Sequence, residues 1–326
     1  MHFVTGMATA TATVTAILLP AVTLAQSNPA YPVKTVRIVV PVAPGGGTDP
    51  QARLLSRKFQ ESMGQSFVVE NRTGAASMIG TEYVVKSPPD GYTLLCGAST
   101  LAGAYTLSKN LSFDLLKDLA PVGQISSAAQ YLVVHASVPV TSVKEFIALA
   151  KKQAGKMNAA SGGNGSANHL VLEMFKQSAG IQATHIPYKG SGPATIALMS
   201  GEVDFSFAGA LTSLPHIRTG KIKALAVTTV KPSPLVPHAT PMASLYPGFE
   251  STNWYAVFAP SGTPAAIVNK ISTEIANAIK APEVREFMAK EGADPVGSTP
   301  QEFAVFFKGE VDRYARVIRA ANIRVE

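Results

Sequence analysis

The stretch "VRIVVPVAPGGGTDPQARLL" (residues 36–55) decides the fold class. It opens with a run of β-branched residues, which is typical of a strand covered on both faces of a parallel sheet. Three consecutive glycines follow, and then Thr48, Asp49 and Pro50 open a helical pattern. Asp49 or Thr48 suits the N-cap, Pro50 suits the first helical position, and Gly64 marks the helix end. A strand that passes through a glycine turn into a helix predicts an α/β fold.

The alternation of strands and helices continues along the chain. Predicted strands over 66–71 and 91–99 enclose a helix and complete a βαβαβ unit with right-handed crossovers. A strand over 130–137 opens a second unit, in which "SGGNGSANH" (161–169) again joins a strand to a helix. After a strand over 254–260 the chain ends in helices, so it can return to its first domain. We therefore expect two lobes, each with a doubly wound sheet, and a cleft between them.

Composition limits the classes of function. The 326 residues are 46% hydrophobic and only 15% charged, which suits a folded chain of two ordinary domains. The net charge of +7 is scattered, with no basic run longer than Lys151-Lys152. Nucleic-acid binding is disfavoured, because phosphate recognition gathers basic residues on one face. A spread positive charge can still steer small anions toward the protein.

The first 30 residues contain no Lys, Arg, Asp or Glu, and an apolar stretch ends in small residues at Ala25. This pattern predicts a secretory signal peptide over residues 1–25, with Met1 and Met7 both candidate start residues. A membrane anchor would need about 20 unbroken apolar residues. Cys96 is the only cysteine, so an internal disulfide is excluded. Export without disulfides favours a bacterial periplasmic location.

The two glycine turns, "APGGGTD" (43–49) and "SGGNGSANH" (161–169), are the candidate binding elements. Open α/β sheets bind ligands at the carboxyl ends of their strands. A helix start offers unpaired N–H groups and the positive end of the helix dipole, which suits an anion. Two such turns facing each other could hold carboxylates without Arg or Lys. The alternative is that both turns are ordinary connections.

Templates for catalysis and cofactor binding are incomplete. Neither glycine turn completes the dinucleotide fingerprint, and no phosphate-loop, nucleophile-elbow or HExxH pattern occurs. We therefore expect no cofactor, no metal and no catalytic residue. His169 could equally be a hydrogen-bonded structural residue, and Asp49 a base or a helix cap. Trp254, the only tryptophan, is either a core residue or a platform for an apolar part of a ligand.

Several motifs together resemble the substrate-binding proteins of tripartite tricarboxylate transporters, the Bug family. The matching pieces cover nearly all of the mature chain and include "YPVKTVRIVVPVAPGGGTD", "VVENRTGAASMIG", "PPDGYTLL", "SGGNGSANHL", "HIPYKGSGPA", "GEVDFSFAG" and "PGFESTNWYAVFAPSGTP". The resemblance implies a periplasmic Venus flytrap, with a first domain over 31–130 plus 256–326 and a second over 131–255. It implies a monomeric, non-enzymatic receptor that delivers a carboxylate to the large and small membrane subunits of a permease.

The resemblance also assigns ligand contacts. The first turn would contribute Pro44, Gly45, Gly46, Gly47, Thr48 and Asp49, and the second Ser161, Gly163, Asn164, Gly165, Ser166 and His169. Positions expected to vary with the ligand are Ser99, Thr100, Ala208, Gly209 and Trp254.

The identity of the ligand stays open among aliphatic di- and tricarboxylates, amino acids or nicotinate-like acids, and aromatic dicarboxylates. Two other functions are weighed against the receptor. One is a secreted hydrolase that uses Ser166, His169 and Asp49, and the other is a sensor that presents its ligand to a membrane kinase.

Overall fold

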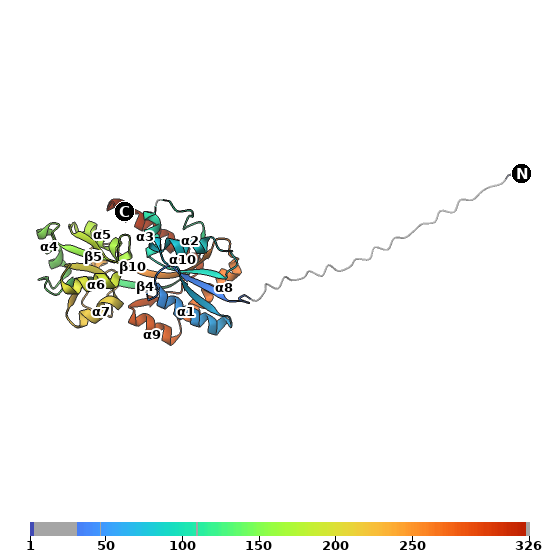
Figure 1. The fold of residues 1–326 in the computed structure, drawn as a ribbon, viewed down its shortest axis with the longest axis horizontal. Coiled ribbons are helices and arrows are strands. Elements are labelled where there is room, and N and C mark those ends of the chain that lie inside the picture. Colours follow the sequence, from blue (N-terminus) through green and yellow to red (C-terminus); the bar gives the residue numbers. More distant parts are fainter. Residues whose placement is uncertain (3–30, 46, 109, 324–326) are drawn as a thin grey trace. The chain divides into compact units, whose positions relative to one another are not determined.

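A computed structural model describes residues 1–2, 31–45, 47–108 and 110–323 of the chain (Figure 1). From residue 3 onward the predicted signal peptide lies outside the described residues, and so does the predicted contact Gly46. One compact unit comprises the chain from Pro32 onward. Among the described residues, no helix combines the length and the apolar composition that crossing a membrane requires.

Strands and helices alternate through most of this unit, as the sequence predicts. The strands are β1 (Val36–Val40), β2 (Phe67–Asn71), β3 (Thr93–Ala98), β4 (Leu119–His135), β5 (Asn158–Ser161), β6 (Thr184–Pro187), β7 (Phe205–Gly209), β8 (Ile222–Val227), β9 (Thr240–Pro241), β10 (Thr252–Pro260) and β11 (Ala293–Pro295). The helices are α1 (Thr48–Met63), α2 (Met78–Val85), α3 (Thr100–Leu107), α4 (Val143–Gln153), α5 (Ala167–Ala179), α6 (Ser191–Ser200), α7 (Ala210–Arg218), α8 (Ala265–Ala278), α9 (Pro282–Lys290) and α10 (Pro300–Ala320), with short 3₁₀ turns η1 (Ala75–Ser77) and η2 (Met242–Ser244).

The strands form one continuous arrangement in the order β2-β1-β3-β10-β4-β7-β5-β6, with β8 and β11 also paired to β4. Parallel pairing joins β1 to β2 and β3, and joins β5 to β6 and β7. Between these two parallel groups, β10 and β4 run antiparallel to their neighbours. The expected α/β fold is confirmed, with two parallel groups of strands as the βαβ pattern requires.

The long strand β4 links the two groups. Its residues up to Ala129 pair with β10, and its residues from Gln130 onward pair with β7. The apolar run predicts this strand over 130–137 only, so its first part is not predicted. The segment "LAPVGQISSAAQ" (119–130) is rich in small and polar residues and contains a proline, so it lacks the apolar run that predicts a strand. Pairing with β10 and β11 makes it a strand.

Helices cover both faces of the strands, with α2, α3 and α10 on one face of the first group and α1 and α9 on the other (Figure 1). One core cluster joins β3, α3, β10 and α10 around Trp254. Two further clusters lie mainly among residues 129–249, around Phe205 and Leu214 respectively. This separation of cores is consistent with a two-domain periplasmic-binding-protein fold, while the predicted domain boundaries stay a prediction.

Helix caps account for where several helices begin. Thr299 and Glu302 form a capping box at the start of α10. Ser142 caps α4 through the N–H of Glu145, but the Glu145 carboxylate accepts from the N–H of Thr141 instead of completing the box. Ser166 caps α5, and Gly64 ends α1 in the left-handed conformation. At these four helices, side-chain caps or a left-handed glycine therefore mark one end.

Candidate functional site

The first glycine turn connects β1 to α1 and leaves its own backbone accessible. Pro44, Gly45 and Gly47 are exposed, and Gly45 has a φ of +78°, a conformation that favours glycine. The helix begins directly after the turn. Because the first N–H groups of a helix have no partner within it, the start of α1 can donate to a ligand.

Asp49 closes this turn instead of capping the helix, which corrects the sequence prediction. The N-cap is Gly47, and it makes no side-chain cap bond. The buried Asp49 carboxylate accepts from the N–H of Gly45 at 3.0 Å, from Arg53 Nε at 3.0 Å and from Asn71 Nδ2 at 2.9 Å. Burial acts to raise the pKa of Asp49, but the hydrogen bonds from Arg53, Gly45 and Asn71 bring it below its usual value. Asp49 is therefore an ionised structural group and not a free base.

Two residues that sequence analysis does not select, Asn253 and Tyr255, lie beside the turn. A Cβ atom on Gly47 would lie 2.7 Å from the Tyr255 hydroxyl oxygen, so that hydroxyl fills the space where a side chain would be. Asn253 Nδ2 donates to the Tyr255 hydroxyl at 2.7 Å, and Ser99 Oγ donates to Asn253 Oδ1 at 2.5 Å. The buried Ser99 at the start of α3 thus connects through two side chains to the first turn.

Trp254 is a core residue, which corrects its assignment as a ligand contact. Its side chain is fully buried against Phe258, Phe303 and Phe307, and its Nε1 donates to Glu310 Oε2 at 3.0 Å. Successive strand residues point to opposite faces, so Asn253 and Tyr255 face away from this core. That alternation around the tryptophan is the sequence signal that could have identified them.

The second glycine turn, between β5 and α5, is held by its own side chains. Gly162 N donates to Asn168 Oδ1 at 3.2 Å, Gly163 N to Ser161 Oγ at 3.1 Å, and Gly165 N to His169 Nδ1 at 3.0 Å. Three N–H groups of this turn therefore already have acceptors. Asn164, between them, is exposed.

His169 is buried behind this turn and stacks on His185, with ring centroids 3.8 Å apart. Burial, with a further contribution from His185 and Lys176, lowers the pKa of His169 to about 3. Burial and Lys176 lower the pKa of His185 to about 4. Both rings are therefore neutral near pH 7, and Nδ1 of His169 can accept the Gly165 hydrogen bond. The structural interpretation of His169 fits this geometry.

Helix α3 connects the two turns. A Cβ atom on Gly103 of α3 would lie 2.7 Å from the carbonyl oxygen of Gly165, and one on Gly165 would clash with Leu107. The same helix begins at Thr100, directly after Ser99. The second turn thus packs on α3, and Ser99 at the start of α3 is hydrogen-bonded through Asn253 to Tyr255.

The remaining predicted contacts lie at the start of α7. Ala208 is buried on β7. Gly209 precedes α7, and nothing lies within 4 Å of a Cβ atom built on it. The adjacent Ala210 packs closely against Gly292, which follows α9. Whether Ala208, Gly209 and the two glycine turns contact one ligand stays a prediction.

The side chains proposed for a hydrolase do not form a catalytic set. The single proton of Ser166 Oγ has two acceptors in reach, Gly163 O at 2.6 Å and Asn168 Oδ1 at 2.7 Å, and His169 Nδ1 accepts from Gly165. Beside this turn, the serine hydroxyl that contacts an imidazole belongs to Ser161, 2.5 Å from His185 Nε2, and Ser161 is fully buried. In the described part of the chain, no group of three or more His, Cys, Asp or Glu could hold a metal ion.

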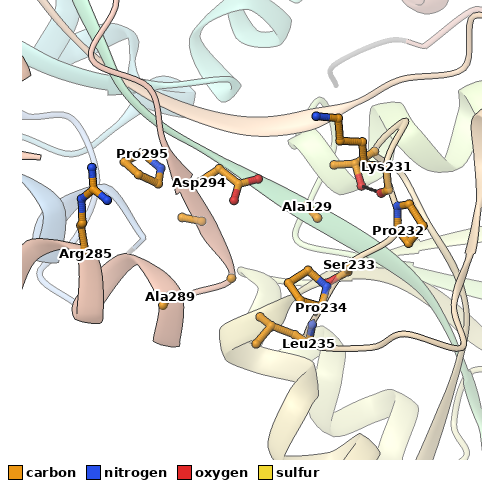
Figure 2. Close-up of a pocket in the computed structure, with 13 residues that line it drawn as sticks. Ala129, Lys231, Pro232, Ser233, Pro234, Leu235, Arg285, Ala289, Asp294 and Pro295 are labelled. Atoms are coloured by element: carbon orange, nitrogen blue, oxygen red, sulfur yellow. Dashed lines mark hydrogen bonds between the residues drawn. The ribbon is translucent and has the colours of Figure 1, made fainter. Parts of the chain in front are cut away.

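A separate cavity of about 240 Å³ lies beside β11, which pairs with β4 on the edge opposite to β10 (Figure 2). Its lining includes Ala129 of β4, Lys231 and Ser233 after β8, and Arg285 and Asp294 from α9 and β11. It contains none of the predicted ligand contacts. Figure 2 shows Arg285 on one side of this pocket and Lys231 on the other, with Pro295, Asp294 and Ala129 between them.

Comparisons with known proteins agree with this architecture. Residues 51–323 match the model of the "Tripartite tricarboxylate transporter family receptor" family. The chain is 37% identical to protein BugT of Bordetella pertussis over 91% of this chain and 92% of that one.

Solved structures are also similar. An R. palustris protein with adipate has a TM-score of 0.81 at 34% identity, covering 90% of this chain and 99% of that one. The periplasmic binding protein BugD has a TM-score of 0.78 at 32% identity, covering 91% and 100%. MatC from Rhodopseudomonas palustris with bound malate has a TM-score of 0.77 at 30% identity, covering 88% and 100%.

Proposed function

Because the chain belongs to the tripartite tricarboxylate transporter receptor family, we propose that it is a periplasmic solute-binding protein for a small carboxylate. The observation that carries the proposal is the exposed glycine turn at the start of α1, within a chain of this family. The adipate and malate held by two solved relatives support a carboxylate as the ligand class.

The electrostatics of the first turn favour an anion. The N–H groups at the start of α1 carry the positive end of the helix dipole. The nearby Asp49 carboxylate would repel an anion, but Arg53 neutralises its charge through a 3.0 Å ion pair. A ligand carboxylate can therefore sit on the main chain of the turn without a lysine or arginine of its own.

The proposed mechanism is capture, closure and delivery. A carboxylate bound between the two lobes would shift the protein toward a closed form, because the ligand contacts both lobes only in that form. The closed protein would then deliver the ligand to a permease with a large and a small membrane subunit. This role requires export, and we propose that the receptor is a monomer without catalytic activity.

A thermal-unfolding screen of residues 26–326 tests the proposal. The panel contains adipate, malate, citrate, benzoate and glutamate at 100 times each expected dissociation constant. A true ligand at that ratio stabilises the folded state by about 2.7 kcal/mol, which raises the midpoint by a few degrees. Native mass spectrometry before the screen identifies any ligand retained from expression. A ligand-free protein that no carboxylate stabilises contradicts the proposal.

A further inference from the structure

We infer that the Tyr255 hydroxyl donates a hydrogen bond to the carboxylate of the bound ligand. The inference rests on the proposed carboxylate-binding function and adds to it a specific side-chain contact. Tyr255 lies on β10, outside the two glycine turns, and it is supported by Asn253 and Ser99.

The direction of the hydrogen bonds leaves the Tyr255 proton available. Ser99 Oγ donates to Asn253 Oδ1, which orients the amide so that Nδ2 points at Tyr255. The Tyr255 oxygen accepts from that Nδ2 at 2.7 Å. A tyrosine hydroxyl has one proton of its own to donate, and no residue in the described part of the chain accepts it. Asn253 and Ser99 are thus positioning residues, because they orient the Tyr255 hydroxyl so that it can donate to a ligand.

The position of the hydroxyl suits a ligand on the first turn. It lies 2.7 Å from where a Cβ atom of Gly47 would be, and Gly47 itself is exposed. An anion that accepts hydrogen bonds from the start of α1 would therefore lie next to this hydroxyl. The absence of a side chain at Gly47 is what allows the hydroxyl to reach the turn.

The surroundings keep Tyr255 a donor. The residue is only 8% exposed, and its burial, together with the charges of Glu291 and Cys96, raises the pKa of the phenol. It therefore stays protonated throughout the neutral range. A buried hydroxyl whose proton has no acceptor costs free energy, and a ligand carboxylate would remove that cost.

Tyr255→Phe tests the contact because it removes only the hydroxyl. Titration calorimetry measures the affinity for adipate, with malate, citrate and benzoate measured beside it. Hydrogen bonds to charged groups predict binding that is about 10- to 100-fold weaker in the variant. The matched control is Tyr92→Phe at the opposite end of β3, where the hydroxyl accepts from the N–H of Val33. The control should bind as the wild type does.

A spectroscopic measurement separates a ligand contact from a structural role. With tyrosines labelled with ¹³C at Cζ, the Tyr255 resonance, assigned by its loss in Tyr255→Phe, should shift on saturation with adipate. Unchanged affinity of Tyr255→Phe, or an unchanged resonance in a wild type that binds, overturns the inference and leaves the proposed function intact. A wild type that binds none of these four acids and no glutamate contradicts both.

Discussion

Gly47 is a position where the absence of a side chain has a measurable consequence. A Cβ atom there would lie 2.7 Å from the Tyr255 hydroxyl, so Gly47→Ala should destabilise the fold by about 1–3 kcal/mol through overpacking. It should also weaken adipate binding, because the start of α1 would move. Chemical denaturation and calorimetry measure the two effects.

The double variant tests the cause of this loss. Removing the hydroxyl leaves the nearest ring carbon, Cζ, at 3.5 Å from the added methyl, an ordinary contact. Gly47→Ala combined with Tyr255→Phe should therefore regain most of the stability. Gly209→Ala is the control, since nothing lies within 4 Å of its Cβ position. If the double variant is no more stable than Gly47→Ala alone, the Tyr255 contact is not the cause.

Within the strand β10, successive side chains point to opposite faces, so core residues alternate with residues that face the proposed ligand. Trp254 faces α10 and donates to the buried Glu310, whereas Tyr255 faces the first turn. Trp254→Phe removes that bond and leaves a void, so it should lower the free energy of unfolding by about 1–3 kcal/mol. The affinity of Trp254→Phe for adipate should stay within about twofold of the wild type, because the Trp254 side chain is fully buried in the core and does not contact the ligand.

The matched comparison for this prediction is the neighbouring Tyr255→Phe, which is expected to behave in the opposite way. That variant should lose affinity while its unfolding free energy changes little. Denaturation curves and calorimetry on both variants give the comparison. A large loss of affinity in Trp254→Phe would contradict this prediction and indicate that Trp254 contributes to the binding site.

At the scale of the whole molecule, the stacked histidines should make stability depend on pH. The folded pKa values of about 3 for His169 and about 4 for His185 lie below the unfolded value of about 6.5. Between about pH 6.5 and 4, the unfolded chain therefore binds protons that the folded chain does not. Each histidine should lower the unfolding free energy by up to about 1.4 kcal/mol per pH unit as the pH falls through this range.

Denaturation at a series of pH values measures this slope. His185→Gln keeps a polar side chain beside Ser161 and removes one titrating group, so its slope should be shallower. His238→Gln, at an exposed position, serves as the control and should leave the slope unchanged. Equal slopes in the wild type and His185→Gln would mean that His185 has the same pKa in the folded and the unfolded chain, which contradicts the prediction.

The amino-acid sequence alone predicts the α/β class, most strand and helix positions, and the two glycine turns. These features depend on local signals such as apolar runs and turn glycines, and Gly64 ends α1 as predicted. The same kind of local signal selects Trp254, the only tryptophan, as a candidate ligand contact in place of its neighbours, although it is a core residue. Which residue of β10 meets the turn depends on which face of the strand is covered by α10.

The contacts between distant segments could not be predicted from the sequence and follow from the folded structure. The Asp49 carboxylate accepts hydrogen bonds from Arg53, Gly45 and Asn71. Ser99 donates a hydrogen bond to Asn253, which lies 154 positions later in the chain. The first part of β4 becomes a strand because β10 and β11 pair with it. Such hydrogen bonds depend on the direction and burial of both partners, and these are fixed only once the chain has folded.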